Sequence, residues 1–346
     1  MRLKTSKFVA VIVPALVGGW AGCGDDRPAA PTTPPKDYIV YMWDRASHYL
    51  AYHAATGRLD TLPPEALHPS DLDVAADGKR LYIRRSDTVT ILDASDYSVL
   101  GELPYPGRGP VTVSPDNQHL VISTGDLYLL RTSDYAVVYH DTDAVTTGCF
   151  SADGGRFYAT GAYQGCQYVY RLDLTTHAVT RTCLPDGYQT FQILASLDEK
   201  FLFLYRRIMH DMFWFDVYDV AADSFVFRKI LIPGFGKMTL GLQGSYVYFS
   251  SPGQLNSDNA CFMAFFTYDI TNRTVDSTYA EGRCLGYRIG FVCQELVITP
   301  DGRYLIGFKH FSPFGMLYDL QADAVTASIC LDLGTCGTYL TCQTFP

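Results

Sequence analysis

Short runs of alternating apolar and polar residues fill most of the chain after Asp37. The segment "VTVSPDNQHLVIST" (111–124) shows the pattern: an alternating run, a Ser-Pro-Asp turn and a second alternating run. Similar segments are "LDVAADGKRLYI" from Leu72 and "LVITPDGRYLIG" from Leu296. A period of two is typical of half-buried β-strands, and a short polar turn between two such runs indicates a hairpin. No segment has the apolar period of an amphipathic helix, so the sequence predicts an all-β chain.

A second kind of hairpin recurs seven times, as in "VTILDASDYSVL" and "VYRLDLTTHAV". The residues that begin its turn are 38 to 50 positions apart: His53, Asp93, Arg131, Asp173, Asp219, Asp269 and Asp319. Aspartate suits this place because its carboxylate can accept backbone N–H groups of the turn. Two hairpins per unit of this length predict the four-stranded blades of a β-propeller.

The first hairpin of each unit has its own turn residues: Asp77, Asp116, Asp153, Asp198 and Asp301. Gly78, Gly154 and Gly302 follow three of them and supply the positive φ that tight turns need. The N-terminal unit lacks this hairpin, because its body begins directly on "DYIVYM" as a second strand. The C-terminal segment "TCGTYLTCQ" can provide the missing inner strand. We therefore predict a seven-bladed propeller of four-stranded antiparallel blades, closed by pairing of the N- and C-terminal strands, which removes two exposed edges.

The segments "PVTVSPDNQHLVIST", "DVAADGKRLYI" and "VTILDASDYSVL" resemble the YVTN/YncE-like family of bacterial seven-bladed propellers. The resemblance covers roughly residues 37 to 342. It implies the fold and no particular activity, because these residues build turns and cores. The recurring Gly-His and Trp-Asp signatures of WD40 repeats are absent: the sequence has no Gly-His pair and a single Trp-Asp pair, at residues 43–44.

The N-terminus has the features of an export signal. Basic residues precede the apolar run "FVAVIVPALVGGW", which is too short to span a bilayer comfortably and ends shortly before Cys23. This segment resembles a bacterial lipoprotein signal, in which the cysteine becomes the lipidated first residue, although Trp20 stands where an aliphatic residue is usual. The alternative is an ordinary secretory signal with an incidental cysteine.

The resemblance divides the chain into a signal peptide (1–22), a Pro-rich tether (23–36) and one propeller domain (37–346). It implies a lipid anchor in a bacterial cell envelope, with the outer membrane favoured by Gly24 where the cell has one. The net charge of −9 argues against nucleic acid or an anionic membrane surface as a partner. The lipid is therefore the only membrane attachment that we expect.

Ten cysteines fit export into an oxidising compartment. A turn at residues 175–176 places Cys166 and Cys183 diagonally on one hairpin, and a turn at 271–272 does the same for Cys261 and Cys284. Diagonal Cβ atoms are somewhat too far apart for a disulfide, so each bond requires a local twist or bulge. We predict both bonds. The remaining body cysteines are odd in number, which requires a thiol or an intermolecular bond.

Candidate binding residues lie on the connections between the second and third strands and between blades. These connections share the face opposite the short turns, and they lengthen toward the last four blades. Arg206, Arg207, His210 and Asp211 are expected to form a polar loop beside Trp214 that could hold a carboxylate or a sugar. The alternative is a solvated loop with internal ion pairs.

Two further groups of residues are candidates. Lys309 and His310 could make a second contact on the same face, or simply be solvated. The other group precedes innermost strands and could line the channel mouth, where polar side chains often only hold water: His68, Asp71, Arg108 and Gln294.

Motifs of catalysis are missing from the sequence. There is no GxSxG elbow, no CxxC or CxxCH, no DxDxDG loop and no phosphate-binding glycine loop. We therefore expect no catalytic residue, metal or cofactor. The leading hypothesis is a non-enzymatic, lipid-anchored propeller that binds a protein or glycan at the envelope. The alternatives are a periplasmic or surface hydrolase, such as a lactonase, that uses the central channel, and a structural role in an envelope assembly.

Overall fold

The computed structural model describes most of the repeat region. The described residues are 39–43, 49–53, 58–62, 71–85, 87–107, 109–142, 145–163, 165–209, 212–231, 238–241, 243–251, 263–280, 295–299, 302–308, 314–321 and 324–330. Within them every regular element is a β-strand, as the alternation predicts. None of these residues forms a helix that could cross a membrane.

The strands of the described residues form seven antiparallel sheets, and in each sheet strands that are consecutive in sequence lie side by side. The first sheet has three strands: β1 (Ile39–Trp43), β2 (Tyr49–His53) and β3 (Arg58–Leu62). Three four-stranded sheets follow: β4 (Asp71–Val74), β5 (Arg80–Arg84), β6 (Val89–Asp93) and β7 (Val99–Leu103); β8 (Val111–Val113), β9 (His119–Ser123), β10 (Leu127–Arg131) and β11 (Val137–Asp141); β12 (Val145–Phe150), β13 (Arg156–Tyr163), β14 (Cys166–Asp173) and β15 (Val179–Cys183).

The remaining three sheets also have four strands each. They are β16 (Thr190–Ala195), β17 (Phe201–Met209), β18 (Met212–Asp219) and β19 (Ser224–Leu231); β20 (Met238–Leu240), β21 (Tyr246–Ser251), β22 (Met263–Asp269) and β23 (Thr274–Ala280); β24 (Glu295–Ile298), β25 (Tyr304–Phe308), β26 (Phe314–Asp319) and β27 (Ala324–Cys330).

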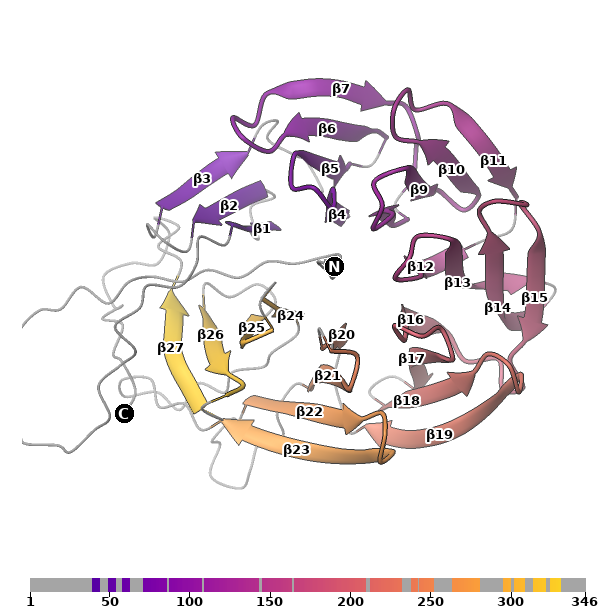
Figure 1. Cartoon of the computed structure of the whole chain (residues 1–346), viewed down its shortest axis with the longest axis vertical. Helices are drawn as coiled ribbons and strands as arrows, with labels where there is room; N and C mark the ends of the chain where they lie inside the picture. Colours follow the sequence, from indigo (N-terminus) through magenta and orange to yellow (C-terminus); the bar gives the residue numbers. More distant parts are fainter. Residues whose placement is uncertain are drawn as a thin grey trace, which may run out of the picture.

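The sheets are arranged around a common centre (Figure 1). The first strand of each four-stranded sheet lies nearest the centre, and the fourth lies at the periphery. The three-stranded sheet β1–β3 lies between the sheets β4–β7 and β24–β27. This is the architecture of a β-propeller. The segment "TCGTYLTCQ", predicted to complete the three-stranded sheet, lies outside the described residues.

The hairpin turns form as the sequence predicts. Asp173 Oδ1 accepts the backbone N–H groups of Thr175 and Thr176 at 3.1 and 2.8 Å. Asp153 Oδ1 likewise accepts the N–H of Gly155 at 2.8 Å. The same kind of bond is made by Asp77, Asp93, Asp116, Asp198, Asp219, Asp269 and Asp319. Gly154 has a φ of 77°, which confirms the predicted left-handed turn position.

The core of the described residues is divided among the seams between blades, with one cluster joining β4–β7 to β8–β11 and another joining β16–β19 to β20–β23. One seam joins the sheets β16–β19 and β20–β23 through stacked aromatic rings. Phe215 of β18 lies 4.8 Å from Phe249 of β21, measured between ring centroids. Such pairs add about 0.5–1.5 kcal/mol to the area term.

Inner strands of neighbouring blades are also joined by polar side chains. Asp73 Oδ2 accepts the backbone N–H of Val113 at 2.9 Å. Gln192 makes two bonds to Met238, donating to its carbonyl oxygen at 2.8 Å and accepting its N–H at 2.6 Å. These bonds satisfy backbone groups that an innermost edge would leave unpaired.

The two faces of the ring differ because the strands alternate in direction. The turns between first and second strands and between third and fourth strands share one face, which we call the short-turn face. The other connections, including those from blade to blade, share the opposite face, which we call the loop face. The loop-face ends of β17 and β18 carry the residues considered next.

Candidate functional site

The structure brings two of the predicted binding residues, Arg206 and Trp214, together at one seam, whereas Arg207 is opposite Phe213 and faces the following blade. Arg206 and Arg207 lie in β17, and Trp214 lies in β18. The expectation that both arginines belong to a polar loop is wrong, because β17 continues to Met209 and pairs with β18 up to that residue. Arg206 is fully buried. Seven other candidates lie outside the described residues: His68, Arg108, His210, Asp211, Gln294, Lys309 and His310.

Asp71 joins two blades. It is the first residue of β4 and is 8% exposed. Its Oδ2 accepts the backbone N–H of Val111, the first residue of β8, at 2.8 Å. This bond duplicates the one from Asp73 to Val113, so we assign Asp71 a structural role between the inner strands.

The alternation along β18 explains how charge enters the seam. Phe213, Phe215 and Val217 belong to the core shared with the following blade. Trp214 and Asp216 alternate with them and therefore point to the opposite face, toward the preceding blade. Asp216 is fully buried there, in the middle of an otherwise apolar strand.

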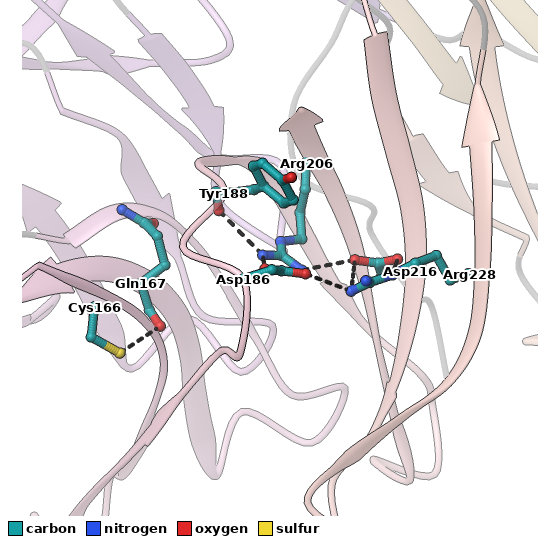
Figure 2. Close-up of polar contacts among 7 residues, drawn as sticks. All are labelled: Cys166, Gln167, Asp186, Tyr188, Arg206, Asp216 and Arg228. Carbon is teal, nitrogen blue, oxygen red and sulfur yellow. Dashed lines mark hydrogen bonds and ion pairs between the residues drawn. The ribbon is translucent and has the colours of Figure 1, made fainter. Parts of the chain in front are cut away.

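Arg206 lies between two aspartates (Figure 2). Its Nη1 donates to Asp216 Oδ2 at 2.9 Å and to Asp186 Oδ2 at 3.2 Å. Its Nη2 bonds Asp186 Oδ1 and lies 3.4 Å from the carbonyl oxygen of Tyr188. Asp186 and Tyr188 belong to the connection between β15 and β16, so Arg206 ties that connection to the blade that follows.

Arg228 of β19 completes the network. Its Nε donates to Asp216 Oδ1 at 2.8 Å, and its Nη2 donates to Asp186 Oδ2 at 2.8 Å. The four side chains carry two positive and two negative charges, which is the pairing that buried ions require. Arg228 is the most exposed of them, at 33%, and so connects the buried network to solvent.

Aromatic rings surround the exposed end of this network. The Arg228 guanidinium lies 3.9 Å from the centre of the Trp214 ring and 4.6 Å from that of Phe225. Tyr188 meets Trp214 edge-on, with ring centroids 4.8 Å apart. A cation over an indole ring is a favourable contact, strongest where water is excluded. We call Tyr188, Trp214 and Arg228 the seam cluster.

The electrostatics of the two aspartates differ. Burial raises the pKa of Asp216, and the Arg228 and Arg206 guanidiniums only partly offset this rise. Burial also acts to raise the pKa of Asp186, but its bonds to Arg206 and the charges of both arginines outweigh burial and lower that pKa. Asp186 is therefore the more strongly stabilised carboxylate.

A disulfide lies just before the connection that carries Asp186. Cys166 and Cys183 are bonded, with Cα atoms 6.0 Å apart, which confirms one predicted bond. The register is also as expected: Cys183 is opposite Tyr168, so Cys166 is its diagonal neighbour. The second predicted bond, Cys261–Cys284, lies outside the described residues.

The preceding seam repeats part of this arrangement. Arg181 Nη2 of β15 lies 2.6 Å from Asp141 Oδ2 at the end of β11. The Arg181 guanidinium also lies 5.3 Å from the centre of the Tyr170 ring. An arginine on an outer strand, an aspartate from the preceding blade and an aromatic ring thus recur in two consecutive seams. The second seam differs by adding the buried pair Arg206–Asp216.

Asp186, Tyr188, Asp216 and Arg228 are not among the binding residues predicted from the sequence. One available signal was Asp216, a charged residue inside the apolar strand "MFWFDVYD". Another was the spacing of the aspartate–arginine pairs, which are separated by 40 and 42 residues, about one blade. Among the described residues no group of His, Cys, Asp or Glu is arranged to hold a metal ion.

Comparison with known proteins bears on the fold. No protein-family model matches the chain, and no curated protein matches it. Hydrazine synthase of Kuenenia stuttgartiensis is similar in structure, with a TM-score of 0.63, 15% identity and coverage of 76% of this chain and 86% of that one. The β-propeller domain of Cps50 (Swd1) from Myceliophteria thermophila has a TM-score of 0.60, 12% identity and the same coverages.

A third similar structure is the dihydro-heme d1 dehydrogenase NirN in complex with DHE. Its TM-score is 0.59 at 15% identity, and the match covers 90% of this chain and 66% of that one. At such low identities a structural likeness speaks for architecture and leaves activity open. Together with the radial sheets, these likenesses establish that the chain has a β-propeller fold.

Proposed function

We propose that the protein is a lipid-anchored, seven-bladed propeller of the bacterial cell envelope that binds a protein or glycan on its loop face. The anchor is supported by the apolar N-terminal run that ends before Cys23, and by the Pro-rich tether that follows. Six four-stranded sheets and one three-stranded sheet support a ring of seven blades in which the C-terminal segment supplies the last inner strand. The repeat hairpins support a relationship to the YVTN/YncE-like propellers.

The seam cluster is the observation that carries the binding function. Trp, Tyr and Arg are the residues most often found at the energetic centres of interfaces. Here Arg228 is held over Trp214 by bonds to two aspartates, and Tyr188 packs against the edge of the same ring. A partner would meet side chains that are already ordered, which reduces the entropy lost on binding.

The similar structures support a propeller module without selecting a ligand. Their descriptions name a hydrazine synthase, a propeller domain of Swd1 and a dehydrogenase in complex with DHE. One architecture therefore serves different activities, and the function must be argued from the site.

A capture experiment tests the binding function. The wild-type protein, Trp214→Ala and a control variant, Tyr246→Ala, are immobilised and exposed to the native envelope fraction. Tyr246 is 41% exposed and follows a short turn, so its loss alters an exposed aromatic residue away from the loop face. We expect a defined protein or glycan to be retained by the wild type and the control, and to be lost from Trp214→Ala.

Retention that is equal in all three proteins would contradict a binding site at the seam cluster. Recovery of a captured glycan in shortened form would instead support the hydrolase alternative. The anchor is tested separately with Cys23→Ser, which should move the protein from the membrane fraction to the soluble fraction. Unchanged partitioning, with no lipid on wild-type Cys23, would contradict the anchor.

A further inference from the structure

A row of three residues with polar side-chain atoms, one of them Trp214 of the seam cluster, crosses the sheet β16–β19. Trp214 of β18 is the register partner of Arg206 in β17, and Thr190 of β16 pairs with Arg206 beside a β-bulge. Directly opposed residues in antiparallel strands share one face, with Cβ atoms about 4.5–5.5 Å apart. Arg206 is 0% exposed and Thr190 is 1% exposed. The polar groups of these three residues are therefore enclosed in the same part of the seam.

Each residue of the row has a buried polar atom without a hydrogen-bond partner in the described part of the chain. These atoms are Thr190 Oγ1, Arg206 Nε and Trp214 Nε1. The two Nη atoms of Arg206 are already bonded to Asp186, Asp216 and the Tyr188 carbonyl, so only its Nε–H remains. Buried polar groups in folded proteins nearly always have a partner. Three such atoms in adjacent residues point to one shared ligand.

We propose that the row binds a single neutral hydroxyl oxygen, supplied by a buried water molecule or by a hydroxyl group of a neutral sugar. The Nε–H and indole N–H groups can only donate, so the ligand atom must accept two hydrogen bonds. The Thr190 hydroxyl can donate or accept, and it supplies the third bond. Three bonds is the usual number for a buried water molecule.

The charges around the row select a neutral ligand. The positive charges of Arg206 and Arg228 are balanced by Asp186 and Asp216, so no anion is needed for neutrality. A metal cation is disfavoured because two of the three groups present hydrogen atoms to it. The sugar source rests on the proposed function, whereas the water source does not depend on it.

A high-resolution crystal structure of the protein without added ligand gives the first test. We expect one oxygen atom within about 2.7–3.2 Å of Arg206 Nε and Trp214 Nε1, with Thr190 Oγ1 as its third partner. A well-defined seam without such an oxygen would overturn the proposal.

The indole N–H resonance of Trp214 gives a second test in solution. The chain has three tryptophans, and Trp214→Phe assigns the resonance. Thr190→Val removes a hydroxyl at nearly constant size and should shift the resonance and speed its exchange with solvent. Thr190→Ser keeps the hydroxyl and should leave the resonance close to that of the wild type. A resonance that responds equally to both changes would contradict a shared oxygen.

Titration identifies the source of the oxygen. A saturable shift of the Trp214 resonance with maltose, cellobiose or chitobiose would assign the oxygen to a sugar. The absence of a shift, with the oxygen present in the crystal, would assign it to water. Because the crystal test does not involve a partner, failure of the envelope capture would leave the water assignment intact. A saturable shift with inorganic phosphate would overturn the neutral character of the site.

Discussion

Replacing Arg206 by methionine removes the buried centre of the seam network. The side chains of Arg206 and Asp216 are both 0% exposed, and they are joined by a bond of 2.9 Å. Methionine fills similar space but leaves Asp216 with one cationic partner, Arg228. Breaking a buried pair by removing one member costs about 3–5 kcal/mol, because the other charge stays buried. We expect a loss near 3 kcal/mol, since Arg228 still bonds both oxygens of Asp216.

The double variant Arg206→Met/Asp216→Leu separates charge from packing. It removes both fully buried ions and leaves Arg228 paired with Asp186, which are 33% and 16% exposed. Apolar replacement of a whole buried pair is often neutral or stabilising. We therefore expect the double variant to recover most of the stability that the single variant loses.

Urea unfolding of the wild type and the variants measures these differences, provided that the m-value, the slope of the unfolding free energy against urea concentration, is unchanged. Arg85→Met is the matched control, because Arg85 and Glu102 form a 3.3 Å pair that is partly exposed on both sides. Its loss should cost less than about 1 kcal/mol. A cost for Arg206→Met no greater than that of this control, or a double variant less stable than the single one, would refute the role of the buried pair.

Four further outcomes are expected. Breaking the Cys166–Cys183 bond by a double serine variant should cost about 2–4 kcal/mol, and reduction of the wild type should remove the difference between the two proteins. Gly109→Ala would place a Cβ 2.2 Å from the carbonyl oxygen of Ser123 and should lower the free energy of unfolding by about 1–3 kcal/mol. Gly101→Ala is the control: its Cβ would have no atom within 4 Å, so the free energy of unfolding should not fall in the same assay. Deleting residues 331–346 should lower the melting temperature strongly if they supply an inner strand, and unchanged melting would mean that the ring closes in another way. Because folding lowers the pKa of Asp186, its carboxylate stabilises the folded state at pH values above about 3.9, the pKa of an unperturbed aspartate. This stabilisation is lost as the pH falls through the lowered pKa of the folded state. The difference in melting temperature between the wild type and Asp186→Asn should therefore be largest at neutral pH and should narrow in acid.

Local chemistry made the repeat predictable. The turns depend on an aspartate and on nearby N–H groups, all within a few residues of the chain. Once the turn is located, alternation with period two fixes which residues lie opposite one another. The predicted turn at 271–272 places Asp269 opposite Thr274, and this pairing is observed, as is the diagonal placement of Cys166 and Cys183.

The seam network could not be predicted in the same way. Asp186 and Arg228 are separated by 42 residues, and their contact depends on how one blade packs against the next. The sequence around Arg206 is also typical of a polar loop, because it includes Arg207, His210 and Asp211. In the structure, pairing with β18 extends β17 through Arg206. The ion pairs with Asp186 and Asp216 make the burial of the Arg206 side chain possible.

A buried ion network is weak grounds for stability, so its presence at this seam calls for another reason. Among the described residues, the preceding seam has the outer pair Arg181–Asp141 without a buried pair like Arg206–Asp216. What the network adds here is a fixed orientation for Arg228 and, through it, for Trp214 at the loop face. The variant Arg206→Met/Asp216→Leu therefore distinguishes two roles. If it is stable and still retains the envelope ligand, the charges serve the seam alone; if it is stable and loses the ligand, they serve to hold the seam cluster in its binding arrangement.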